Sequence, residues 1–337
     1  MEELRTLAIH LVTWNHRAYL PELFGSLDEQ TWKQTSVTVV DNASNDGTAD
    51  WMRDFRPGVV VLRNFRNQGF ARAHNQAIAM SLSRWPEETW SSRYIMVASP
   101  NLVLASDCLE QLVKRMDQNP SLAACCPKIL RAVFRAGTED DAPEIERTQE
   151  IDSVGLIMKK SRHPVDRGVG EQDTGQYDEE REVFGCSGTC MLIRASALAE
   201  AKIDGEWFDE DFFSYGVDAD FFWRLQRMGK QIRVVPSAVA WHHHALHQRT
   251  GATRTPAAQA MAARNRFWTT IKNDQVPNWL LHLPWIIAGG LWSALRSPSR
   301  IRGKFSSLIK VPLMLRKRAE VQPRVQVHAS EIRHWFV

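Results

Sequence analysis

Short apolar segments rich in β-branched residues alternate with amphipathic segments over the first 118 residues of the chain. The apolar segments predict strands at residues 7–13, 36–42, 59–64 and 93–99. The amphipathic segments predict helices at residues 17–30, 46–52, 69–83 and 106–118. Strands separated by helices of this size predict an α/β fold, with a mostly parallel sheet that carries helices on both faces.

Polar residues follow each predicted strand: Thr13 to Asn15, Asp41 to Ser44, Asn64 to Gly69, and Ser99 to Asn101. Parallel α/β sheets bind ligands at the carboxyl ends of their strands, so these residues are candidates for a binding site. The turn after the first predicted strand, TWNHRAYL, contains no glycine. A dinucleotide-binding fold needs a glycine-rich turn there, so the pattern argues against a dehydrogenase.

Residues 208–228 combine an aromatic loop with a predicted helix that stops at Gly229. The apolar positions of this helix recur at helical spacing: Phe221, Phe222, Leu225 and Met228. Asp218 shares their face, where a carboxylate is costly unless it is used or paired. We therefore predict a general base, with a helix cap as the simpler alternative. Asp220 points elsewhere and is predicted to be a first-turn residue paired with Arg224.

The composition narrows the class of protein. A chain of 337 residues suggests one large domain plus an appendage, and a net charge of +3 is too small to indicate a nucleic-acid partner. The start of the chain, MEELRTLAIH, does not read as a signal peptide. The five cysteines lie in apolar surroundings without metal-ligand spacing, which favours a reduced cytosolic protein: Cys108, Cys125, Cys126, Cys186 and Cys190.

The C-terminal region changes character near residue 256, which divides the chain into predicted regions 1–255 and 256–337. Residues 258–273 read as a helix, and residues 278–295 are apolar and rich in tryptophan but interrupted by proline and glycine. This segment is short for a membrane span. Only basic charges follow over residues 296–318, which predicts contact with an anionic membrane surface. The alternative is an appendage that packs on the rest of the chain or on a second copy in a homodimer.

Three N-terminal stretches, LVTWNHRAYLPELFGSL, VVDNASNDGTADW and RNFRNQGFARAHNQAI, resemble the family 2 glycosyltransferases of the GT-A fold. The rhamnosyltransferase-like branch, which builds bacterial surface polysaccharides, is the most similar. The resemblance extends over residues 7–245 and includes the stretches FGCSGTCMLIRASAL and FDEDFFSYGVDADFFWRL.

The resemblance implies a nucleoside-diphosphate sugar held at the carboxyl edge of the sheet. Asn15 would lie near the base, and Asp41 and Asn42 would bond the base or ribose through acceptor and donor groups. The alternative for residues 41–47 is a simple turn and helix cap. The full set of residues expected to contact the donor is Thr13, Asn15, Asp41, Asn42, Asn67, Gly69, Asn75, Ser99 and Gly188.

The chain departs from the family at two positions. It has Ser99-Pro100-Asn101 where relatives carry Asn-Pro-Asp, whose carboxylate binds the divalent metal, and Val217-Asp218 where relatives carry Glu-Asp. Asn101 offers a neutral oxygen, which is a weaker ligand for Mg²⁺ or Mn²⁺. His242, the first of three consecutive histidines, aligns with a residue that contacts metal or diphosphate. Additional cations for the diphosphate would come from His247, Arg249 and Arg254.

The implied activity is an inverting, single-displacement sugar transfer in which Asp218 deprotonates the acceptor hydroxyl. The acceptor would be a glycan or a lipid-linked sugar, and the protein would work on the inner face of the plasma membrane. The two departures also motivate an alternative, a non-catalytic homologue that binds a nucleotide sugar or a partner transferase. Two interruptions of the α/β pattern are predicted to be a mobile acidic loop at 135–150 and a glycine-rich segment at 166–180 that folds over donor or acceptor.

Overall fold

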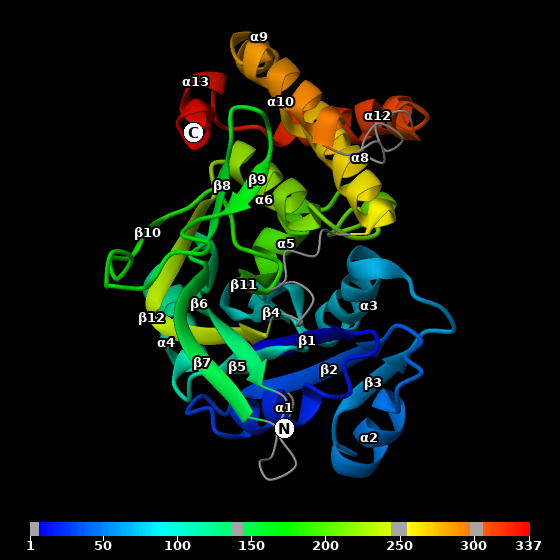
Figure 1. Cartoon of the computed structure of the whole chain (residues 1–337), viewed down its shortest axis with the longest axis vertical. Helices are drawn as coiled ribbons and strands as arrows, with labels where there is room; N and C mark the ends of the chain where they lie inside the picture. The colour runs from blue at the N-terminus through cyan, green and yellow to red at the C-terminus, as the bar shows by residue number, and fades with distance from the viewer. Residues whose placement is uncertain (1–6, 136–143, 244–254, 297–305) are drawn as a thin grey trace.

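The computed structural model describes residues 7–135, 144–243, 255–296 and 306–337 (Figure 1). The strands are β1 (Leu7–Thr13), β2 (Thr35–Asp41), β3 (Val60–Arg63), β4 (Tyr94–Ala98), β5 (Leu102–Leu104), β6 (Leu122–Arg135), β7 (Glu144–Ser153), β8 (Leu156–Met158), β9 (Pro164–Asp166), β10 (Arg181–Glu182), β11 (Cys190–Arg194) and β12 (Gln231–His243). The α-helices are α1 (Leu20–Asp28), α2 (Thr48–Phe55), α3 (Gly69–Arg84), α4 (Cys108–Gln118), α5 (Ala195–Ala201), α6 (Val217–Arg227), α8 (Pro256–Asn273), α9 (Val276–Leu281), α10 (Leu283–Arg296), α12 (Val311–Val321) and α13 (Ala329–Ile332).

The large sheet has the strand order β10-β12-β6-β11-β4-β1-β2-β3. Strands β3, β2, β1 and β4 are parallel, and β11 runs antiparallel between β4 and β6. The predicted mostly parallel α/β sheet is therefore confirmed. The parallel strands end at Thr13, Asp41, Arg63 and Ala98, which brings the loops after them to one edge of the sheet.

Alternate residues of each central strand face opposite sides of the sheet and build separate cores. On β4, Ile95 and Val97 pack with residues of α3, α5 and α6, whereas Tyr94 and Met96 pack with residues of α1 and α4. Both faces are thus covered by helices, which explains why the strands read as continuous apolar runs. The five cysteines are buried free thiols.

The predicted loop at residues 135–150 is wrong in part. Residues 144–150 belong to β7, which pairs antiparallel with the long strand β6, and residues 136–143 lie outside the described chain. The acidic composition of this segment suggested a loop, but β6 supplies cross-strand partners for residues 144–150. Arg131 pairs with Glu150, and the Thr148 hydroxyl donates to the Arg131 carbonyl.

Helix α6 lies close to where the sequence predicted it. Its charged residues Asp220, Arg224 and Arg227 are as buried as its phenylalanines. Asp220 does contact Arg224, at 3.5 Å, and it also accepts hydrogen bonds from Lys272 and Asn273 of α8. Helix α6 is surrounded by protein and therefore has no polar face toward solvent. Its buried charged side chains are paired with groups inside the protein, which offsets the cost of their burial.

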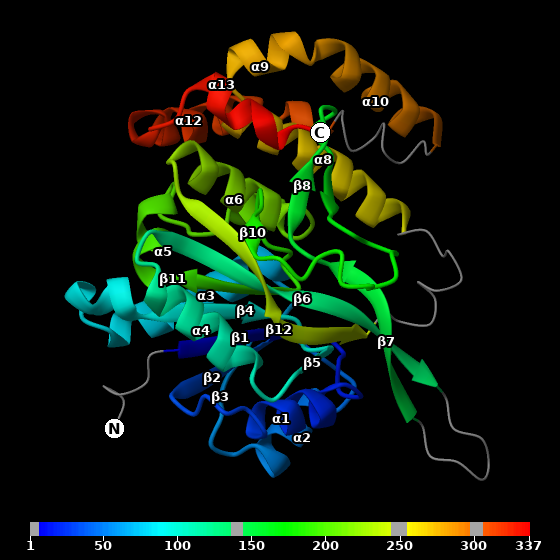
Figure 2. The ribbon, with the colours of Figure 1, turned by 90° about the vertical axis from the view of Figure 1, so that its left-hand side faces the viewer.

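Helices α8 to α13 cover the sheet domain on the side of α6, and α9 and α10 form the outermost layer (Figure 2). Met314 and Val321 of α12 and Phe336 near the C-terminus are buried against the rest of the chain. The described helices after residue 256 therefore pack on the sheet domain. In the described part of the chain, no helix combines the length and apolar character needed to cross a bilayer.

Candidate active site

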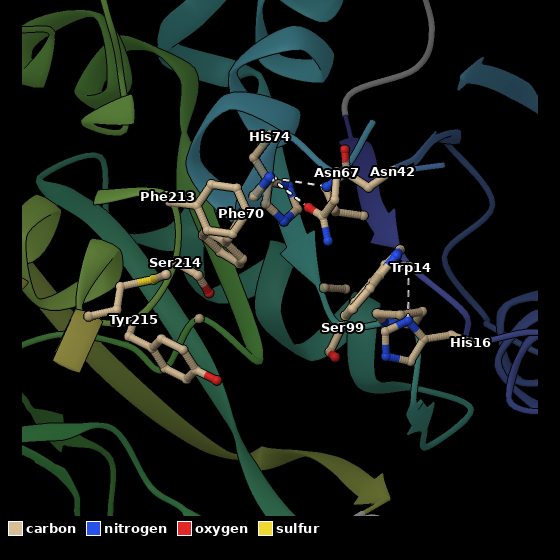
Figure 3. A pocket seen from close by; sticks show the side chains of 16 residues that line it. Trp14, His16, Asn42, Asn67, Phe70, His74, Ser99, Phe213, Ser214 and Tyr215 are labelled. Carbon is tan, nitrogen blue, oxygen red and sulfur yellow. Dashed lines mark hydrogen bonds between the residues drawn. The ribbon is translucent and has the colours of Figure 1, made fainter. Parts of the chain in front are cut away.

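In the part of the chain that the structure describes, two cavities of about 280 and 820 Å³ adjoin beside the carboxyl ends of β1 and β4. The smaller cavity is bordered by Trp14 and His16 on one side and by Phe213 to Tyr215 on the other (Figure 3). The larger one extends between the β8–β9 hairpin and α8. Both are lined by Phe70, Ser99, Gly188, Ser214 and Tyr215, so these residues mark the junction.

Asp218 lies beside this junction, on the first turn of α6, and lines the larger cavity. Gly216 precedes the helix in the left-handed conformation, with φ of 74°, and turns the chain so that Asp218 lines the larger cavity. One carboxylate oxygen accepts a 2.9 Å hydrogen bond from the Gly188 N–H, and the other accepts one of 2.8 Å from the Ala219 N–H. These bonds hold the carboxylate in one orientation toward the cavity, as a general base requires.

Three predicted donor-binding residues shape the smaller cavity. Gly69 has φ of 78°, and an added Cβ would lie 2.4 Å from the Phe213 carbonyl oxygen, so only glycine fits. The Asn67 side chain accepts from the Gly69 N–H at 2.8 Å, and the Asn42 amide donates to the Gly69 carbonyl at 3.1 Å. Asn42, Asn67 and Gly69 therefore form one hydrogen-bonded wall that brings the N-terminus of α3 against the cavity.

Four other predicted donor-binding residues line neither of the two described cavities. Thr13 is buried at the end of β1, and its carbonyl accepts from the Asn42 N–H at 2.8 Å. Asn75 bonds both the N–H and the carbonyl of Phe208, and so holds the aromatic loop against α3.

Asn15 and Asp41 brace the loop after β2. The Asn15 N–H donates to the Ser44 hydroxyl at 2.9 Å, and the Ser44 N–H donates to the Asp41 carboxylate at 2.9 Å. Asp41 is buried and lies 3.5 Å from Arg63. The arrangement agrees with the turn that composition alone suggested as an alternative, and direct contact of these residues with a donor stays a prediction.

The two predicted metal ligands are both held by neighbouring groups. The Asn101 amide donates to the His243 carbonyl at 2.7 Å, and its oxygen accepts from the Ser99 hydroxyl. His242 lines the larger cavity with its Nδ1 atom 2.8 Å from Asp152. Among the described residues, no three His, Cys, Asp or Glu side chains are grouped to hold a metal ion. The described donor set therefore does not fit a metal centre built on Asn101, and His244, His247, Arg249 and Arg254 lie outside the described residues.

Asp166 is a cavity residue that sequence reasoning missed. It lies on β9 in the wall of the larger cavity. Burial, together with the charges of Asp152 and Asp218, raises the pKa of Asp166 to about 6, against the opposing effect of the Ser153 and Ser187 hydroxyls. Strongly perturbed carboxyl groups beside a cavity mark functional sites. No local pattern in the sequence brings residues 152, 166 and 218 together, so this cluster was not predictable.

The smaller cavity also contains residues that were not among the predicted donor contacts, including His16, Phe213 and Tyr215, and Trp14 from the candidate segment at residues 13–15. Burial lowers the pKa of His16, with a further decrease from His242 and an opposing effect of Asp46. Because the Trp14 N–H donates to Nδ1 of neutral His16 at 3.1 Å, the ring proton is on Nε2. The signal was available, since both Phe213 and Tyr215 belong to the aromatic loop and Trp14 follows the first strand.

Helix α8 shapes the aromatic loop directly. The Asn265 amide donates to the carbonyls of Phe212, Ser214 and Tyr215 at 2.9, 2.6 and 2.8 Å. Phe213 and Tyr215 have positive φ angles of 63° and 61°, a conformation that costs energy in a non-glycine residue. Asn265 satisfies the carbonyls that this backbone turns toward α8, so the helical region is part of the site.

A buried charge network connects α8 and α12 to the aromatic loop. Asp209 contacts Lys272 of α8 and Lys317 of α12, and Lys272 also donates to Asp220 at 2.9 Å. Burial alone would raise the pKa of Asp209, but the two ammonium groups outweigh it and hold the pKa well below its usual range. Removing one partner of such a network would leave an uncompensated buried charge. Lys272 and Lys317 therefore hold α8 and α12 against Asp209 in the aromatic loop.

Residues 8–201 match the family described as Glycosyl transferase family 2, so the chain belongs to this family and is a glycosyltransferase. The chain is 28% identical, over 88% of its length and 93% of the relative, to N-acetylglucosaminyl-diphospho-decaprenol L-rhamnosyltransferase of Mycobacterium tuberculosis. Its fold is similar to S. aureus TarS 1-349 in complex with UDP-GlcNAc, with a TM-score of 0.53 at 14% identity over 95% of this chain and 83% of that one.

A further solved structure, GalNAc-T7 with UDP, GalNAc and Mn²⁺, has a TM-score of 0.57 at 14% identity. It aligns with 81% of this chain, which spans 48% of that protein. These similarities confirm the GT-A-like fold, with its mixed sheet, that the family resemblance implied.

Proposed function

We propose that the protein is an inverting glycosyltransferase that moves a sugar, rhamnose in the first instance, from a nucleoside diphosphate to a hydroxyl of a lipid-linked acceptor. The observation that carries the proposal is the placement of Asp218, oriented by Gly188 at the junction of two cavities. The similarity to the mycobacterial rhamnosyltransferase supports the choice of sugar and acceptor. No observation on the described residues favours the non-catalytic alternative.

The smaller cavity suits the nucleoside. It lies at the carboxyl edge of the parallel strands and offers the indole of Trp14, which is half exposed, as a surface for an aromatic base. The Nε2–H of neutral His16 is a donor for the diphosphate, which would lie toward the junction. The donor sugar would then occupy the junction beside Gly188 and Ser99, and the acceptor would enter the larger cavity.

The chemistry follows from this placement. Asp218 accepts the proton of the acceptor hydroxyl, whose oxygen attacks the anomeric carbon as the bond to the nucleoside diphosphate breaks. One base suffices for this single displacement, and the configuration at the anomeric carbon inverts. Preorganised donors at the diphosphate would stabilise the negative charge that develops on the leaving group. Among the described residues, no three His, Cys, Asp or Glu side chains are grouped to hold a divalent cation, so the steps above involve only the residues of the chain.

The outer face of α9 and α10 suits the surface of an anionic membrane, where a lipid-linked acceptor would reside. Large apolar side chains are exposed on it, including Leu280, Trp285, Ile287, Leu291, Trp292 and Leu295. These helices form the outermost layer of the molecule (Figure 2). Between residues 275 and 319 the chain carries basic residues and no Asp or Glu, so the face and its surroundings complement anionic lipid.

The experiment is a transfer assay with a panel of nucleoside-diphosphate sugars and an N-acetylglucosaminyl-diphospho-lipid acceptor. Donors are first chosen by thermal shift, because a ligand that binds only the folded state raises the melting temperature. We expect turnover with a rhamnose donor and none with Asp218→Asn. Turnover that requires a different donor would correct the sugar, and absence of transfer from every donor that binds would refute the proposal.

A further inference from the structure

The β8–β9 hairpin connects the larger cavity with the exposed face of α9 and α10. Asp166 of β9 lies beside Asp218 at the inner part of the cavity, and His163 lines the same cavity just before β9 begins. The larger cavity, of about 820 Å³, is lined by His163, Asp166 and Asp218, so it leaves room for a sugar ring whose hydroxyl points at Asp218.

The tip of this hairpin is packed under α10. An added Cβ on Gly289 would lie 2.8 Å from the Ser161 side chain, so helix and hairpin are in close contact. Lys160 lies 5.8 Å from the ring centre of Trp285, whose indole is exposed on the outer face. Lys160 therefore lies beside the apolar face of α10, two and three positions before Arg162 and His163, which line the larger cavity.

Basic side chains line the larger cavity at the β8–β9 hairpin and at α8. Arg266 of α8 lines it, and its guanidinium donates to Nδ1 of His163 at 3.4 Å. His163 and Arg266 line only the larger cavity, on the side of the β8–β9 hairpin and α8. The cavity thus has a carboxylate beside Gly188, a junction residue, and basic groups where α8 meets the hairpin at His163.

Arg162 is a structural member of the same hairpin. Its buried guanidinium pairs with Asp274 at 2.7 Å and donates to the Lys160 and Asn278 carbonyls. The charge of Arg162 is therefore balanced within the protein. It fixes the hairpin tip to the turn between α8 and α9, and so sets the positions of Lys160 and His163 on either side.

We infer that Lys160, His163 and Arg266 bind the diphosphate of the acceptor, with the acceptor sugar directed inward to Asp218 and its lipid outward along α10. Cationic and N–H donors suit phosphate oxygens, and the neighbouring apolar face suits a hydrocarbon chain. The inference rests on the proposed transfer to a lipid-linked acceptor. It adds the residues that recognise the diphosphate and the direction in which the acceptor enters.

The test compares two acceptors in detergent: a short-chain lipid diphosphate sugar, and an alkyl glycoside of the same sugar without phosphate. Lys160→Ala, Arg266→Ala and the double variant are measured against Arg316→Ala, which removes an exposed arginine of α12. We expect each cavity variant to raise KM for the diphosphate acceptor about tenfold with little change in kcat. KM for the alkyl glycoside should stay the same, and Arg266→Lys should restore part of the loss.

Donor binding by thermal shift shows that each variant is folded. An unchanged KM for the diphosphate acceptor in the double variant would overturn the inference while leaving the proposed function intact. Variants that lose binding to phosphatidylglycerol vesicles but keep KM in detergent would show that these cations serve the membrane instead, which also overturns it. A wild-type protein that transfers to neither acceptor would refute the proposed function itself.

Discussion

The Asp218 carboxylate accepts a 2.9 Å hydrogen bond from the backbone N–H of Gly188, across the junction of the two cavities. This contact joins the start of α6 to the loop before β11, two segments 30 residues apart in the chain. It orients the base without neutralising it, because a neutral N–H donates a single bond. The first two predictions concern these two residues.

Asp218→Asn should remove most turnover and leave donor binding nearly unchanged. The amide keeps the size of the side chain but cannot accept the acceptor proton, and loss of a general base typically costs about 10²–10⁴ in rate. Single-turnover transfer and donor thermal shift measure the two properties separately. Asp54→Asn, an exposed carboxylate on α2, is the matched control. Turnover close to that of wild type would refute the assignment of Asp218.

Gly188→Ala should slow transfer in a protein that still folds. A Cβ at this position would lie 3.3 Å from the Asp218 carboxylate and 3.4 Å from the Phe70 ring, so the base must shift by a few tenths of an ångström. A displacement of about 1 Å can cost 10²-fold, so we expect a loss of about tenfold in kcat. Gly58→Ala, where a Cβ meets no atom within 4 Å, is the control. Equal kcat values for both variants would show that the contact is not needed.

Asp166→Asn should stabilise the protein at neutral pH. The pKa of Asp166 is raised from 3.8 to about 6, first by burial. The folded state therefore holds a proton that the unfolded state loses between about pH 4 and 6, and stability falls as pH rises through this window. The cost above pH 6 is about 1–3 kcal/mol in the free energy of unfolding, and the asparagine variant avoids it. Denaturant unfolding of the wild type and of Asp166→Asn at pH 4 and pH 7.5 measures this cost. The assignment is contradicted if the variant gains no more stability over the wild type at pH 7.5 than at pH 4.

Asn101→Asp should destabilise the metal-free protein and make it respond to Mn²⁺. The carboxylate cannot donate to the His243 carbonyl, and a lost bond of this kind costs about 1–3 kcal/mol. It would, however, supply the charged ligand that the wild type lacks, so Mn²⁺ should restore melting temperature in this variant. Asn101→Ala loses the same bond without gaining a ligand and is the control. Stabilisation of the wild type by Mn²⁺ as strong as that of Asn101→Asp would contradict the expectation, as would a wild-type turnover that modest chelation abolishes.

Replacing Ile287, Leu291 and Leu295 of α10 by glutamine should reduce binding to phosphatidylglycerol vesicles at least tenfold. Leu291 and Leu295 are 61% and 82% exposed, so the substitutions remove apolar surface that a membrane would bury without disturbing the core. Phe55→Gln, another exposed apolar site on α2, is the control. Flotation at low salt measures binding, and wild-type protein that stays with the soluble fraction would refute the membrane proposal. Deletion of residues 275–337 is unsuitable, because it would also remove the buried Lys317 that pairs with Asp209.

The sequence by itself determined the alternation of strands and helices and the carboxyl edge beside which the cavities lie, and it indicated the candidate base at the start of α6. Periodicity, turn residues and helix starts are local properties, so a single sequence contains them. The family resemblance located Gly69 and Gly188, and the structure shows the close contacts that make Gly69 necessary.

Only the tertiary structure decided which charges are buried and which carboxylates meet. The sequence predicted only Arg224 as the partner of Asp220, because nothing near it in the sequence indicates Lys272, which lies 52 positions later and pairs with it in the interior. The same holds for Asp166 beside Asp218, and for Asn265, which reaches the aromatic loop from α8. The free energy of a buried charge depends on the groups that surround it in space, and segments distant in the chain supply those groups.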